Sequence, residues 1–215
     1  MAGRVALLVC VMMVMLWPLQ GVGVHAEGPS PVSQAQPAQG GVQPVLPPQT
    51  VAAVDLSRYM GQWYEIAAIP IVFERRCVAD SLANYSLLPD QKIEVVNSCR
   101  MANGQRIASI GRAWVTDPQT NAKLRVAFTN IWGVRRFARG DYWILSVDPE
   151  YRFAIVGHPT RRYGWILSRT PLIPPENLVN LSKQLVALGY DPCRFMIMPQ
   201  YGGITQRLSL CQLVK

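Results

Sequence analysis

Apolar and polar residues alternate along most of the chain in short runs that end at turn-forming residues. In residues 122–130 (AKLRVAFTN), Leu124, Val126 and Phe128 alternate with charged or polar neighbours. Successive side chains of a strand point to opposite faces of a sheet, so this pattern predicts a strand with one buried face.

Further runs of this kind occupy residues 62–69, 81–88, 92–99, 106–115, 141–147, 152–158 and 163–169. Proline, glycine, asparagine and aspartate mark the turns between them, and residues 89–91 (PDQ) predict a hairpin. Eight strands joined by short turns predict an all-β fold. We expect an eight-stranded up-and-down antiparallel β-barrel, with a sandwich as the alternative.

One helix is expected late in the chain, over residues 174–190. Pro175 stands near its start and Gly189 at its end, as is typical of helix boundaries. Its apolar stripe is formed by Leu178, Leu181, Leu185 and Leu188. This pattern predicts a C-terminal α-helix packed on the outside of the sheet. Residues 194–200 then predict a short ninth strand.

The N-terminus resembles an export signal. Arg4 precedes an apolar run at residues 5–17, and residues 24–26 (VHA) fit a small-x-small cleavage rule. The run is too short for a bilayer, which needs about 20 residues. We therefore expect a signal peptide at 1–26. The alternatives are a membrane anchor and a lipid attached to Cys10, although valine, not a small residue, precedes that cysteine.

The remaining chain divides by composition. Residues 27–54 are rich in proline and lack periodicity, which predicts a flexible linker. Residues 55–200 are long enough for one domain with a single core. Residues 201–215 form a C-terminal tail. We expect an exported protein of the periplasm or outer membrane, or a secreted one.

The net charge and the cysteines restrict which partners, disulfides and metal sites are expected. The formal net charge is +8, and removal of Arg4 lowers it by one; such an excess suits anionic surfaces without naming one. Of five cysteines, four follow the signal peptide, and an even number in an exported protein predicts two disulfides. Nearness in sequence favours Cys77–Cys99 and Cys193–Cys211, with Cys77–Cys211 as the rival. No CxxC spacing occurs and His158 is the one histidine left, so no metal and no cofactor are predicted.

Three short motifs resemble those of the lipocalin family. Residues 61–66 (GQWYEI), 147–151 (VDPEY) and 165–171 (WILSRTP) are similar to its three signatures, in the same order. The resemblance covers residues 54–200 and is strongest to the bacterial outer-membrane lipocalin and apolipoprotein D-like branch. It implies an eight-stranded barrel, closed at one end, with an apolar ligand cavity. It also implies that Gly61, Trp63 and Arg169 close the base, with the guanidinium over the indole.

In the lipocalin family, alternate residues of each strand face the cavity, and the resemblance indicates which residues of this chain do so. The expected lining is Tyr85, Val95, Asn97, Val126, Phe128, Tyr142, Ile144, Val156, Trp165 and Leu167. Most are apolar, as an amphiphile pocket requires. Tyr85, Asn97 and Tyr142 are expected to bind a carboxylate or another polar head group. The alternative is that these side chains fill the barrel as a closed core.

Basic residues are expected to gather at the open end. In an up-and-down barrel alternate loops share an end, which brings together Arg75, Arg76, Arg135, Arg136, Arg139, Arg161 and Arg162. With Trp132 and Phe137, this rim would contact an anionic membrane surface. The alternative is a set of ordinary solvated loops.

The sequence therefore predicts a protein that binds, transports or stores small hydrophobic ligands, such as fatty acids or lysophospholipids, in the bacterial envelope. A structural envelope protein with a filled barrel is the alternative. No catalytic residue is assigned: an enzyme of the prostaglandin synthase type would need a free thiol, and pairing with Cys77 would disable Cys99. Export and an apolar interior argue against a nucleic-acid partner.

Overall fold

The computed structural model describes residues 46–130 and 138–214. The predicted signal peptide, with Cys10, and most of the predicted linker lie outside these residues. So do Trp132, Arg135, Arg136 and Phe137.

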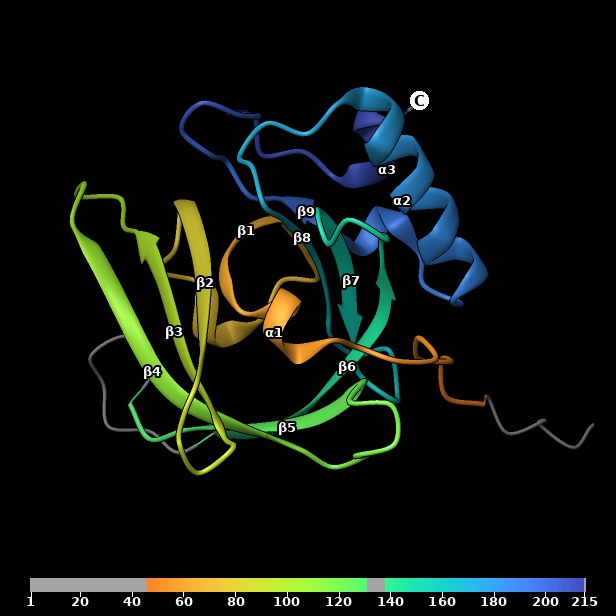
Figure 1. Ribbon diagram of the computed structural model, residues 1–215. Coiled ribbons are helices and arrows are strands. Elements are labelled where there is room, and N and C mark those ends of the chain that lie inside the picture. Colours follow the sequence, from red (N-terminus) through yellow and green to blue (C-terminus); the bar gives the residue numbers. More distant parts are fainter. Residues whose placement is uncertain (1–45, 131–137, 215) are drawn as a thin grey trace, which may run out of the picture. The chain divides into compact units, whose positions relative to one another are not determined.

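The described chain forms a closed antiparallel barrel (Figure 1). Its strands are β1 (Gly61–Ala68), β2 (Ala79–Leu87), β3 (Ile93–Arg100), β4 (Arg106–Val115), β5 (Lys123–Phe128), β6 (Ala138–Val147), β7 (Phe153–Gly157) and β8 (Gly164–Ser168). Each strand pairs with the next, and β1 pairs with both β2 and β8. This closure confirms the predicted eight-stranded barrel and rules out the sandwich.

The largest differences from the expected strand boundaries occur at β6 and β9. β6 begins at Ala138, earlier than predicted, because Ala138 pairs with Phe128 and extends the hairpin with β5. β9 is limited to Met196–Ile197 and adds to the free side of β1. A 3-10 turn at Pro192–Arg194 precedes it and Pro199, which has no N–H to donate, follows it.

The predicted helix is α2 (Pro175–Ala187), and it lies outside the barrel (Figure 1). Its buried face packs in one cluster with Ile66, Ile155 and Ile166, which point outward from their strands. This explains why β7 and β8 are apolar on both faces, whereas β5 alternates. None of the described helices is long and apolar enough to cross a membrane.

The short helices were not predicted. α1 (Leu56–Tyr59) precedes β1, a 3-10 helix (Val72–Glu74) follows it, and α3 (Leu210–Leu213) lies in the tail. Asp55 caps α1 by accepting hydrogen bonds from Ser57 N at 2.9 Å and Arg58 N at 3.3 Å.

The ordered domain begins before residue 55. Val51 N donates to Ile144 O at 3.1 Å, and Val54 N donates to Thr120 O at 2.8 Å. Pro48 and Val54 are buried. Residues 46–54 therefore lie packed against the barrel, which corrects this part of the predicted flexible linker.

Both preferred disulfides are confirmed. Cys77 is bonded to Cys99, and Cys193 to Cys211. The first joins the β1–β2 connection to the end of β3. The second holds α3 against the 3-10 turn that precedes β9, so the tail is tied to the barrel wall.

Candidate functional site: an open cavity in the barrel

One end of the barrel is sealed around Trp63. Its indole is fully buried and donates to Tyr59 O at 2.9 Å. The Arg169 guanidinium carbon lies 3.8 Å from the Trp63 ring centroid, a cation–π geometry. Gly61 has φ +91° beside Arg169, a backbone conformation that favours glycine.

Arg169 also ties three separate segments together. It donates to Gln62 O at 2.8 Å, to Arg58 O at 2.7 Å and to Tyr151 O at 3.2 Å. Because these carbonyls belong to β1, α1 and the β6–β7 turn, one side chain closes the base.

Above this base the barrel holds a cavity of about 650 Å³. Its wall includes the predicted residues Tyr85, Val95, Asn97, Val126, Phe128, Tyr142, Trp165 and Leu167. The volume lies within the ordinary range for small-molecule sites, about 300–1,000 Å³. The interior is therefore not filled by side chains.

Ile144 and Val156 are exceptions among the predicted lining residues. Both are fully buried in the cluster that contains Trp63, and neither lies in the cavity wall. Strand alternation correctly gives their inward direction. It does not give depth, and these two side chains form part of the packed core.

A cluster of tyrosines belongs partly to the wall and partly to the core. Tyr142 Oη lies 2.8 Å from Tyr59 Oη and 3.0 Å from Tyr85 Oη. Burial raises the pKa of Tyr85 to about 12 and those of Tyr59 and Tyr142 well above their ordinary value. All three stay neutral near pH 7. Two hydrogen bonds use two of the three hydroxyl protons, which leaves one donor.

Two glutamates that were not among the predicted site residues line the same cavity. Glu65 lies on β1 and is 9% exposed, and Glu74 ends the 3-10 helix of the β1–β2 connection. Burial, and then the neighbouring Glu74 charge, raise the pKa of Glu65 well above its usual range. Burial raises the pKa of Glu74 to about 7, against the lowering effects of a Trp165 hydrogen bond and of Arg207. Glu65 has the same strand parity as Trp63, so alternation along β1 was the sign that could have revealed it.

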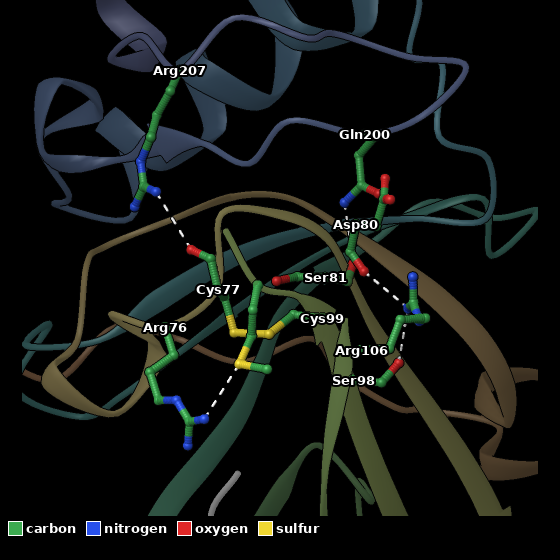
Figure 2. Close-up of a disulfide and its surroundings, with 10 residues drawn as sticks. Arg76, Cys77, Asp80, Ser81, Ser98, Cys99, Arg106, Gln200 and Arg207 are labelled. Carbon is green, nitrogen blue, oxygen red and sulfur yellow. Dashed lines mark hydrogen bonds between the residues drawn. A yellow bond between two sulfur atoms is a disulfide. The ribbon is translucent and has the colours of Figure 1, made fainter. Parts of the chain in front are cut away.

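The predicted rim arginines separate into groups. Arg139 and Arg162 lie in the cavity wall. Arg75 and Arg76 are exposed on the β1–β2 connection, where Arg76 donates to Met101 Sδ at 3.3 Å (Figure 2). Arg135 and Arg136 lie outside the described residues.

Arg161 departs from the predicted rim. Its Nε donates to Leu188 O at 2.8 Å, and its Nη1 donates to Leu46 O at 2.9 Å. It therefore binds carbonyls at the end of α2 and in the N-terminal segment.

Potential metal ligands are dispersed in the described part of the chain, which holds no cluster of three or more His, Cys, Asp or Glu side chains suited to a metal ion. His158 Nδ1 lies 2.9 Å from Thr160 Oγ1, and its Nε2 lies 3.9 Å from Asp141 Oδ2. Burial lowers the pKa of His158 despite Asp141.

Comparison with protein families and curated sequences gives consistent matches. The lipocalin-like domain family matches residues 54–200. Temperature-induced lipocalin-1 of Arabidopsis thaliana is 39% identical over 158 residues, which are 71% of this chain and 82% of that protein. Outer membrane lipoprotein Blc of Escherichia coli is 36% identical over 161 residues, 73% of this chain and 87% of Blc. Mouse apolipoprotein D is 34% identical over 145 residues, 64% and 72% of the two chains.

Solved structures share the fold at lower identity. Insecticyanin from the tobacco hornworm Manduca sexta aligns with TM-score 0.57 and 24% identity, over 76% of this chain and 93% of its own. The cockroach allergen Per a 4 aligns with TM-score 0.55 and 18% identity, over 71% and 93%. These likenesses support the barrel topology.

Proposed function

The chain belongs to the lipocalin family, whose members bind small hydrophobic ligands, and from this premise we propose that it carries or stores fatty acids, lysophospholipids or similar lipids in the bacterial envelope. The observation that carries the proposal is the open cavity of about 650 Å³, with its largely apolar wall. Burial of an acyl chain there would contribute about 0.8 kcal/mol for each CH₂ group.

The envelope location is supported by two features. The N-terminal segment resembles a signal peptide, and both disulfides belong to chemistry that persists in oxidising compartments. A relative named outer membrane lipoprotein, Blc, covers most of the same length.

The cavity also bears on the alternatives. A structural protein with a filled barrel would leave no space of this size. A thiol-dependent lipocalin enzyme would need a free cysteine in the barrel, whereas Cys99 is bonded to Cys77. We therefore propose a binding role without catalysis and without a nucleic-acid partner.

The mouth is proposed as the side that approaches a membrane. Arg75 is exposed there and Arg139 and Arg162 lie at the cavity. In the same connection as Arg75, Val72 is 62% exposed and Phe73 is 40% exposed. Cations next to exposed apolar side chains suit an anionic lipid surface.

The proposed binding is tested by tryptophan fluorescence. Trp165 lies in the cavity wall, whereas Trp114, on β4, does not. Titration with fatty acids and lysophospholipids should change the emission of the parent protein and of Trp114→Phe, and the response should be largely lost in Trp165→Phe. Absence of any response in the parent, with every lipid tested, would overturn the proposal.

A further inference from the structure

We propose that Glu65 and Glu74 form a subsite for the polar group of the ligand, and that this group is a protonated primary amine on an alkyl or acyl chain. The inference rests on the proposed binding function and specifies which amphiphiles the cavity prefers. It replaces the expectation that a carboxylate head group occupies the site.

The two carboxyl groups come from neighbouring parts of the fold. Glu65 lies on the inner face of β1, and Glu74 lies in the 3-10 helix that follows this strand. Both belong to the wall of one cavity, together with Trp165 and Ser81. An acidic region therefore interrupts a wall that is otherwise mostly apolar.

Two hydrogen-bond acceptors of this wall lack donors. Glu65 Oε1 and Asn97 Oδ1 are buried and have no hydrogen-bond partner among the described residues. Most buried side-chain polar atoms in proteins are hydrogen-bonded, and a buried acceptor without a donor destabilises the fold. A ligand that supplies donors would remove this destabilisation.

A primary ammonium matches these acceptors better than a carboxylate does. It brings three N–H donors and a positive charge. A carboxylate brings only acceptors, and its charge would be repelled by the Glu74 carboxylate when this group is ionised, in a cavity of low polarity. Charge and hydrogen bonding therefore favour the same ligand class.

The cations and other ionisable groups near the pair do not remove the need for a ligand donor. Arg207 acts on both glutamates, but it is exposed to solvent, which screens its charge, and its Nη1 lies 3.5 Å from Cys77 O (Figure 2). Tyr85 also faces Glu65 and stays neutral. The remaining charged residues of the wall are Arg139, Asp141 and Arg162.

Binding should release a proton. Without a ligand the raised pKa values of Glu65 and Glu74 keep at least one of the two protonated near pH 7. An ammonium between them would take the place of that proton. Amine affinity should therefore fall as the pH drops below about 7, the pKa of Glu74.

The test compares amphiphiles of one chain length by isothermal titration calorimetry at pH 8. Dodecylamine, dodecanoic acid and dodecanol are titrated into the parent protein and into Glu65→Gln and Glu74→Gln. Glu94→Gln is the matched control, because Glu94 lies on β3 outside the cavity wall.

We expect dodecylamine to bind at least about tenfold more tightly than dodecanoic acid, a difference of about 1.4 kcal/mol. Each cavity variant should reduce this preference and keep a cooperative unfolding transition, and its affinity for dodecylamine should fall more than its affinity for dodecanol. The Glu94→Gln control should behave as the parent. At pH 5.5 the amine should bind the parent more weakly, with a smaller change in the variants.

A preference for the acid, or an amine preference that survives both substitutions, would overturn the subsite while leaving the binding function intact. If none of the three amphiphiles binds, both the proposed subsite and the proposed binding function are contradicted.

A second pair of ligands identifies the source of the amine. Lysophosphatidylethanolamine has a primary ammonium with three N–H donors. Lysophosphatidylcholine of the same acyl chain length has a quaternary ammonium with no N–H. Tighter binding of the ethanolamine form supports a lipid head group as the ligand. Equal binding of the two, with the dodecylamine preference kept, supports a free long-chain amine.

Discussion

Glu65 and Glu74 carry the greatest departure from ordinary side-chain chemistry in this barrel. Their carboxyl groups lie in a largely apolar wall, where ionisation is costly. A natural protein usually keeps such a cost only where function requires it. The pair should therefore affect stability as well as binding.

The Glu74 carboxyl group should lower the stability of the unliganded protein as the pH rises from about 4.5 to about 7. The ordinary Glu pKa is 4.5 and that of Glu74 in the fold is about 7. Within this window the folded state binds more protons than the unfolded state, so the free energy of unfolding falls with increasing pH. Glu74→Gln removes the contribution of Glu74 to this dependence and leaves that of Glu65, while the amide oxygen of Gln can still accept from Trp165. Its melting temperature at pH 8 should exceed that of the parent by about 2–4 °C for each kcal/mol recovered.

Differential scanning calorimetry at pH 4.5 and pH 8 measures this effect, with Glu94→Gln as the control. The two proteins should melt at similar temperatures at pH 4.5. A Glu74→Gln protein that is less stable than the parent at pH 8 would show that the carboxylate stabilises the fold.

Arg169 is the other residue with a large expected effect. Its replacement by leucine removes three hydrogen bonds and the contact with Trp63, so unfolding should cost about 3 kcal/mol less. Arg169→Lys should recover only part, because an ammonium lacks the planar fork of donors. Urea denaturation measures the loss. Arg152→Leu breaks an exposed pair with Asp148 and should cost under about 1 kcal/mol. Equal losses at the two sites would contradict the role given to Arg169.

Alternation along the strands correctly predicted which side chains point into the barrel. It did not predict whether those side chains line the cavity or belong to the packed core. It places Ile144 and Val156 inward, yet both lie in the packed core. It also places Glu65 inward, but an acid was not expected within an apolar pocket. Hydrophobic patterning alone cannot reveal a polar group kept inside for a ligand.

Helices and strands could be predicted from the sequence where they are long enough to show a regular apolar pattern. The strands are long enough for alternation and end at clear turn residues, and α2 has a full apolar stripe. α1 and α3 span 4 residues each, too few to show a period. Residues 46–54 dock through backbone hydrogen bonds and through a few buried side chains, such as Pro48 and Val54, which are too few to form a recognisable pattern.

The Cys193–Cys211 disulfide should matter mainly to the C-terminal segment. Its loop has a sequence separation of 18 residues, so replacing both cysteines with alanine should cost about 3 kcal/mol. Amide hydrogen exchange should accelerate in the tail and β9 while β3 and β4 stay protected. Cys77→Ala with Cys99→Ala is the matched comparison, with its effect centred on the β1–β2 connection and β3. Uniform acceleration over the barrel in the tail variant would contradict this local role.

For the whole molecule, topology links distant parts of the sequence. Closure of the barrel gathers alternate connections at one end, and the described arginines of that end include Arg75, Arg139 and Arg162. The meander was predictable because neighbouring strands pair in sequence order. The size of the cavity was not, because it depends on how all inward side chains pack together.

Anionic vesicles should bind the mouth in a salt-dependent way. Replacing Arg75, Arg139 and Arg162 together with serine should weaken binding by at least about tenfold at low salt, since each surface cation contributes about 1 kcal/mol. The control removes the same number of charges at the other end, as Lys92→Ser, Arg112→Ser and Arg152→Ser together; the first two residues lie beside Asp90 of the β2–β3 turn and Arg152 beside Asp148 of the β6–β7 turn. Vesicle co-sedimentation measures the difference. Equal weakening by both sets would show that only net charge matters.

The proposal that the barrel holds an amphiphile is best tested by native mass spectrometry of protein released from a bacterial envelope without detergent. We expect one bound amphiphile per chain, and loss of that mass in Val126→Trp, which places an indole in the cavity wall. A parent protein that is empty on isolation, and that takes up no lipid, lysophospholipid or long-chain amine when these are added, would contradict the account.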